Sequence, residues 1–81
     1  METLIKELEA DLLELYGPLL HGRDLCRVLG YPSLEAMRQA VLRDTLPVHI
    51  FPIKNRRGKF ALAKDVAKWL AEQRTQVRER R

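Results

Sequence analysis

The densest group of residues able to do chemistry is a basic segment, KNRRGK, at positions 54–59. Lys54, Arg56, Arg57 and Lys59 supply its four cations, and Asn55 and Gly58 lie between them. Cations this close together neutralise neighbouring phosphates and release the counterions condensed on a nucleic acid. The other interpretation is a solvent-exposed turn that its charge keeps soluble. We expect the segment to contact a polyanion.

No second group of residues has the spacing of a catalytic or metal site. His21 and His49 are far apart in the sequence, without a thiol or carboxylate at the spacing of metal ligands. Cys26 is the only cysteine, so an internal disulfide cannot form, and its apolar neighbours indicate a small core residue. We therefore expect no enzymatic activity, no cofactor and no metal.

The composition of the 81 residues is that of one soluble globular unit, with 46% hydrophobic and 32% charged residues. The start of the chain lacks the pattern of a signal peptide and no apolar run reaches membrane length, so we expect a cytoplasmic protein. Residues 1–20 carry five acids against Lys6, whereas residues 21–81 carry 14 cations against six acids. A basic body attached to an acidic end predicts an acidic partner such as nucleic acid.

Residue periodicity predicts an α+β fold of four helices and one hairpin. Apolar residues at helical spacing indicate an amphipathic helix over residues 2–16, ended by Gly17 and Pro18. A two-turn helix that Gly30 stops is followed by a helix that Ser33 caps, over residues 33–43. Two β-rich runs, 47–53 and 60–62, flank the basic segment and predict a hairpin, and a last helix is expected over residues 64–80.

Two short helices joined by a tight turn with a glycine are typical of a helix-turn-helix. The stretches LLHGRDLCRVLGYPSLEAMRQAV and GKFALAKDVAKWL resemble the MerR-like and excisionase (AlpA-type) families of small DNA-binding proteins. This resemblance implies a winged helix-turn-helix that is mostly helical, with a two-stranded β-hairpin as its wing. It also implies that helix 33–43 reads the major groove and that the wing, residues 54–59, lies on the backbone or in the minor groove.

Both helices and the wing are expected to contribute DNA contacts. Arginine pairs bidentately with guanine and glutamine with adenine, so Arg38 and Gln39 are the expected base readers. Arg43 near the end of that helix, with Arg23 and Arg27 on the preceding one, suits phosphates better. The expected DNA-binding residues are Arg23, Arg27, Ser33, Glu35, Arg38, Gln39, Arg43, Lys54, Asn55, Arg56, Arg57 and Lys59.

The acidic helix at the start of the chain, residues 1–18, is separate in character from the expected DNA-binding unit, residues 19–81. It either completes the core of its own chain or pairs with a second copy. The small interface of one recognition helix favours a homodimer or a cooperative oligomer on double-stranded DNA.

The resemblance implies a bacterial or phage transcriptional regulator, or a recombination directionality factor, acting with RNA polymerase or an integrase and without a membrane. The alternative is a protein-interaction adaptor or inhibitor that uses the same basic fold.

Overall fold

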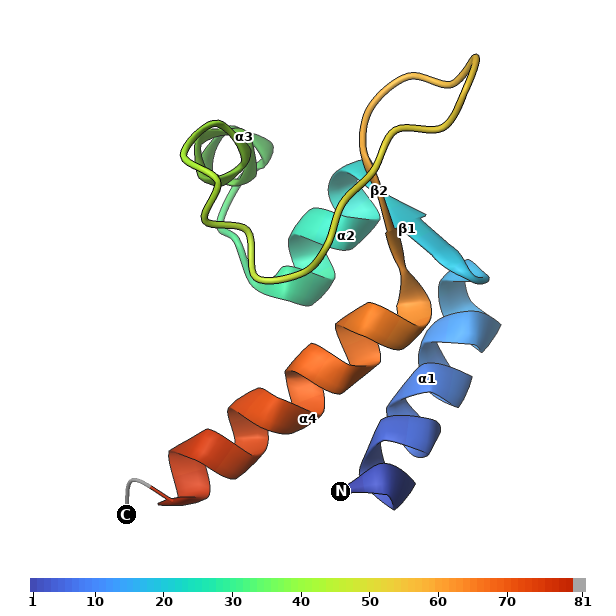
Figure 1. Ribbon diagram of the computed structural model, residues 1–81, viewed down its shortest axis with the longest axis vertical. Coiled ribbons are helices and arrows are strands. Elements are labelled where there is room, and N and C mark those ends of the chain that lie inside the picture. The colour runs from blue at the N-terminus through green and yellow to red at the C-terminus, as the bar shows by residue number, and fades with distance from the viewer. Residues whose placement is uncertain (80–81) are drawn as a thin grey trace.

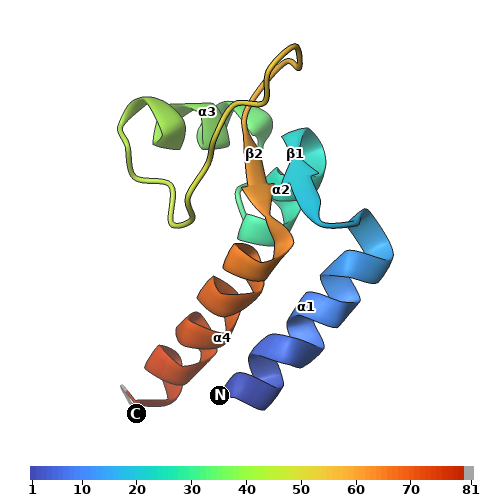
Figure 2. The same cartoon turned by 45° about the vertical axis from the view of Figure 1, so that its right-hand side comes forward.

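Two long helices lie side by side in one half of the molecule, and two short helices with a small sheet occupy the other half (Figures 1 and 2). The long helices are α1 (Glu2–Tyr16) and α4 (Ala63–Glu79), and the molecule measures 40 × 26 × 17 Å. This computed structural model describes residues 1–79, with the side chains of residues 1–76. The last two residues of the expected 19–81 unit lie outside the described part.

Helix α1 places its apolar face against α4. Leu12 is buried, and Ile5, Leu8 and Tyr16 pack at the edge of the core. Gly17 ends the helix with a φ of 83°, a backbone conformation that side-chain-bearing residues rarely adopt. The acidic helix therefore contributes to the core of its own chain, and its pairing with a second copy stays a prediction.

The sheet has two antiparallel strands, β1 (Leu19–His21) and β2 (Phe60–Leu62), in which Leu20 lies opposite Ala61. The prediction that residues 47–53 form the strand that pairs with β2 was wrong. That segment contributes only one bridge, in which Phe51 and Phe60 exchange two backbone hydrogen bonds of 2.9 Å. The next residue, Pro52, has no N–H group to continue a ladder, so the first run of the predicted hairpin, residues 47–53, does not become a strand.

The two short helices, α2 (Gly22–Leu29) and α3 (Leu34–Leu42), begin and end where local signals predict. Gly30 has a left-handed backbone with a φ of 86°, and the amide of Tyr31 donates to the carbonyl of Cys26 at 3.1 Å. These features form the glycine stop expected from the sequence. The Ser33 hydroxyl accepts a hydrogen bond from the amide of Ala36 at 3.1 Å, which confirms Ser33 as the N-cap of α3.

The core lies where α4 meets the sheet, α1 and α2. Its largest fully buried side chains are Leu20, Leu25 and Val66. Cys26 is also buried, as expected of a small core residue, and its thiol lies 3.7 Å from the carbonyl oxygen of Tyr31. The α+β class, with four helices and one two-stranded antiparallel sheet, is confirmed. No helix in the described part of the chain is long and apolar enough to span a bilayer.

Candidate functional site

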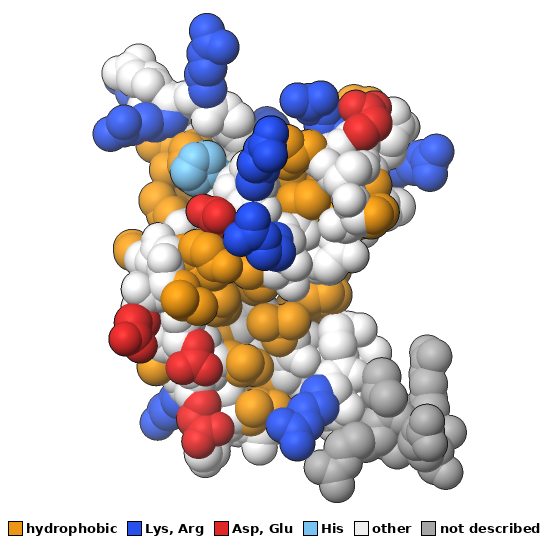
Figure 3. Space-filling view, turned by 180° about the vertical axis from the view of Figure 1, so that it is seen from behind, with side chains coloured by type: hydrophobic (Ala, Val, Ile, Leu, Met, Phe, Trp, Pro, Cys, Tyr) orange, Lys and Arg blue, Asp and Glu red, His pale blue; other side chains and the backbone are white. Residues whose placement is uncertain are grey.

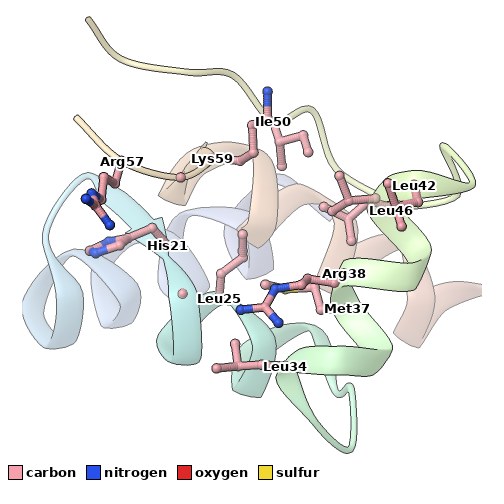
Figure 4. A pocket seen from close by; sticks show the side chains of 13 residues that line it. His21, Leu25, Leu34, Met37, Arg38, Leu42, Leu46, Ile50, Arg57 and Lys59 are labelled. Carbon is pink, nitrogen blue, oxygen red and sulfur yellow. The ribbon is translucent and has the colours of Figure 1, made fainter. Parts of the chain in front are cut away.

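A pocket of about 470 Å³ opens between α2, α3 and the segment that leads to β2 (Figure 4). Its walls are apolar and come from α2, from α3 and from the chain that follows α3. They consist of Leu25, Leu34, Met37, Val41, Leu42, Leu46 and Ile50. Four polar side chains, each a cation or a histidine, complete its lining: His21, Arg38, Arg57 and Lys59.

Tertiary structure brings these polar side chains together from three separate segments. Figure 4 shows His21 and Arg57 on one side of the pocket and Arg38 on the other. The His21 ring is held at the end of β1 by Phe60, which faces it across the sheet with a ring-centroid distance of 5.0 Å. Two of the expected wing cations, Arg57 and Lys59, therefore line the same pocket as Arg38, an expected base reader.

The basic loop, residues 54–59, is a turn that projects beyond the sheet (Figures 1 and 2). The Phe51–Phe60 bridge closes its base, and the amide of Arg56 donates to the carbonyl of Ile53 at 3.0 Å. Asn55 has a φ of 65°, which the third position of a tight turn requires and asparagine tolerates better than most residues. Every side chain of the loop is exposed.

The outer face of α3 carries a small hydrogen-bonded cluster. Glu35 lies 3.5 Å from the Arg38 guanidinium and accepts a hydrogen bond of 3.1 Å from the side-chain amide of Gln39. The Glu35 and Arg38 side chains are 67% and 73% exposed, so solvent screens their ion pair strongly. Both side chains remain accessible to a partner, as does that of Gln39.

The remaining expected site residues fall into two sets. Arg23, Arg27 and Ser33 border a second, more open hollow that shares Leu34 with the first. Because Leu34 lines both hollows, the cations of α2 lie next to the start of α3. The residues that border neither of these two hollows are Glu35, Gln39, Arg43, Lys54, Asn55 and Arg56, and all six are exposed.

Charge is separated along the molecule. Figure 3 shows Lys and Arg side chains projecting around the upper end, where α3 and the basic loop lie, and acidic side chains gathered lower down over α1. In the part of the chain that the structure describes, Arg38 and Glu35 form the only ion pair. The other described cations of α2, α3 and the loop consequently have no carboxylate within 4.0 Å to neutralise them.

The apolar pocket was not predicted from the sequence. Leu34, Met37 and Val41 have the spacing of an inward helix face, which predicts burial, but in the structure they are only partly buried. The signal available in the sequence was Leu42, an apolar residue one position beyond that face. In the structure its side chain is 79% exposed. Exposed large apolar side chains beside partly buried ones indicate an incompletely covered surface.

Among the described residues, no group of three His, Cys, Asp or Glu side chains is placed to hold a metal ion. Comparisons with protein-family models, with curated proteins and with solved structures find no match for this chain. The arrangement of charge and shape at the upper end of the molecule is therefore the basis for assigning a function.

Proposed function

We propose that this protein binds double-stranded DNA sequence-specifically, as a small winged helix-turn-helix protein of the MerR-like or excisionase type. The observation that carries this proposal is the shared pocket of Arg38, on α3, with Arg57 and Lys59, on the basic loop. A helix and a loop that present cations around one hollow match the two contacts a winged helix makes with a duplex. The absence of carboxylate partners for the loop cations in the described part of the chain supports it further.

In the proposed complex, α3 enters the major groove and the basic loop lies on the backbone or in the adjacent minor groove. Arg38 and Gln39 contact base edges, because guanidinium and amide groups match guanine and adenine there. The loop cations and the arginines of α2 bind phosphates, which fix the register of the protein on the duplex without reading sequence. The role assigned to the protein is that of a transcriptional regulator or a recombination directionality factor, without catalysis.

One recognition helix and one loop cover a small area of DNA, so we propose that two or more copies bind repeated half-sites. The exposed face of α1 is available for contacts between copies, with Leu15 71% exposed. An acidic helix at the end of the molecule away from α3 and the basic loop keeps such contacts clear of the phosphates.

The test is selection of a randomised duplex library on the purified protein at about physiological salt, where non-specific attachment is weakened. A short recovered motif, repeated at a fixed spacing, supports DNA recognition and gives the geometry of the oligomer. Binding that is weak, sensitive to salt and free of sequence preference rejects the sequence-specific function.

A second candidate is an adaptor that covers an acidic protein with the same surface. The observation that favours it is Leu42, which borders the pocket and is 79% exposed. An exposed apolar surface is typical of a protein–protein contact, whereas a DNA duplex offers mainly phosphates and polar base edges. This candidate predicts that the protein ignores duplex DNA even at low salt and forms a stable complex with one acidic protein. Retention of duplex DNA at low salt, with a motif at higher salt, rejects it.

A further inference from the structure

The pocket between α3 and the basic loop has a composition unlike that of a DNA contact surface. We propose that it binds a small apolar anion, an alkyl or aromatic carboxylate, and that this ligand and DNA exclude each other. The ligand site stands on the pocket itself. The exclusion rests on the proposed DNA-binding function.

Size and walls fit a small molecule. The volume of about 470 Å³ lies within the range of ordinary ligand sites, roughly 300–1,000 Å³. Leu25, which is only 1% exposed, forms part of the lining, and Met37 and Ile50 face the same space from α3 and from the loop side (Figure 4). An apolar body placed there removes partly exposed leucine, methionine and isoleucine surface from water.

The charge of the lining selects the polar end of the ligand. Arg38, Arg57 and Lys59 are the charged groups of the lining, and no acidic side chain among the described residues borders the pocket. Arg38 alone has a described carboxylate partner, Glu35, at a loose 3.5 Å. A carboxylate at the rim gains hydrogen bonds from guanidinium groups whose fork geometry matches its two oxygens. A cationic ligand group at the same place would be repelled by these three side chains.

The exclusion follows from shared residues. The guanidinium and ammonium groups that would neutralise the ligand are the same groups that would contact base edges and phosphates. Among the described residues, no hydrogen bond joins α3 to the basic loop. A ligand held between these two elements would therefore fix the distance between them. Coupling between two ligands is reciprocal, so DNA must weaken carboxylate binding by the same factor as the carboxylate weakens DNA binding.

The direct test is calorimetric titration of the full chain with hexanoate, octanoate and decanoate below their micelle-forming concentrations. Affinity is expected to rise by up to about fourfold for each added methylene, because each one buries further apolar surface. Decanol and decyltrimethylammonium are the matched probes without the negative charge, and both should bind more weakly than decanoate. Absence of saturable decanoate binding, or equal binding of the three decyl probes, overturns the proposal.

Two pairs of matched variants locate the site. Leu42→Gln and Leu15→Gln each change an exposed leucine, but only Leu42 borders the pocket. Lys59→Gln and Lys68→Gln each remove an exposed lysine, and only Lys59 borders the pocket. Decanoate affinity should fall by about threefold or more in the first member of each pair, as for loss of a weak surface contact, and stay unchanged in the second. Equal losses within a pair overturn the location.

DNA competition tests the exclusion separately. At a decanoate concentration about ten times its Kd, the apparent Kd for duplex DNA should rise about tenfold. Saturable decanoate binding without any effect on DNA binding rejects exclusion and leaves the ligand site standing. Failure of the protein to bind DNA at all rejects the proposed function, and the calorimetric result still decides the ligand site.

Discussion

The side-chain amide of Gln39 donates a 3.1 Å hydrogen bond to the carboxylate of Glu35, one helical turn earlier on α3. The same carboxylate lies 3.5 Å from the Arg38 guanidinium. In the free protein, both expected base readers are therefore engaged by one acidic side chain. In the proposed complex, binding to bases requires these interactions to be exchanged for new ones, and the Glu35 carboxylate would lie close to the negatively charged duplex.

Glu35→Gln is expected to strengthen binding to every duplex by about two- to fivefold. The substitution removes a negative charge from the surface proposed to face DNA, and it gives up only an exposed ion pair worth about 0–1 kcal/mol. Fluorescence anisotropy with a cognate and a random duplex measures the change. The control is Asp11→Asn, which removes an exposed acid from α1, outside the proposed DNA-binding surface. It should alter binding much less. Equal effects from the two substitutions would show that net charge alone is responsible.

Replacing Arg38 or Arg56 by alanine should separate sequence reading from phosphate binding. Arg38→Ala is expected to weaken specific binding by about 1–3 kcal/mol and to relax preference at one base pair. Arg56→Ala should weaken all sequences to a similar extent and reduce the salt slope by about one. The measurement is the Kd for cognate and random DNA over a range of salt concentrations. If Arg38→Ala reduces cognate and random binding equally, Arg38 does not read bases.

Asp44→Gly should stabilise the protein by about 0.5 kcal/mol, because glycine adopts a left-handed backbone without the strain of a side chain. Asp44 has a φ of 57° at the end of α3, where the Thr45 amide donates to the Ala40 carbonyl at 2.9 Å. Gly30 occupies the equivalent position at the end of α2, with a φ of 86°. Gly30→Asp is thus the reciprocal control and should lose about 1 kcal/mol in urea unfolding. Destabilisation by Asp44→Gly would mean that the aspartate side chain is required there.

Leu20→Ala is expected to destabilise the fold by about 2–5 kcal/mol, since it opens a cavity at a fully buried position. Leu20 is 1% exposed in β1 and packs in the central cluster. Leu15→Ala, on the exposed side of α1, is the comparison and should stay within about 0.5 kcal/mol of the unsubstituted protein. The midpoint of urea unfolding measures both. A large loss from Leu15→Ala at low protein concentration would indicate a role for that side chain which its exposure does not predict.

Local signals in the sequence were sufficient for the helices. Helix α1 spans Glu2–Tyr16, matching the predicted bounds, and α3 has Ser33 as its N-cap and Arg43 as its C-cap. Caps, left-handed stops and apolar periodicity act between residues at most a few positions apart, so they are visible in a linear string. The exposure of the cations on α3 and in the basic loop follows for the same reason.

The partner of β2 and the apolar pocket depended on tertiary structure. A strand of three residues, Leu19–His21, carries no alternation long enough to identify it, and its pairing with Phe60–Leu62 joins segments far apart in the chain. The pocket arises because α3 is not packed closely enough against α2 and the loop to bury Met37 and Leu42. Periodicity shows that a helix face is apolar. Whether that face is covered depends on which distant segments fold against it, and a period within one helix contains no information about them.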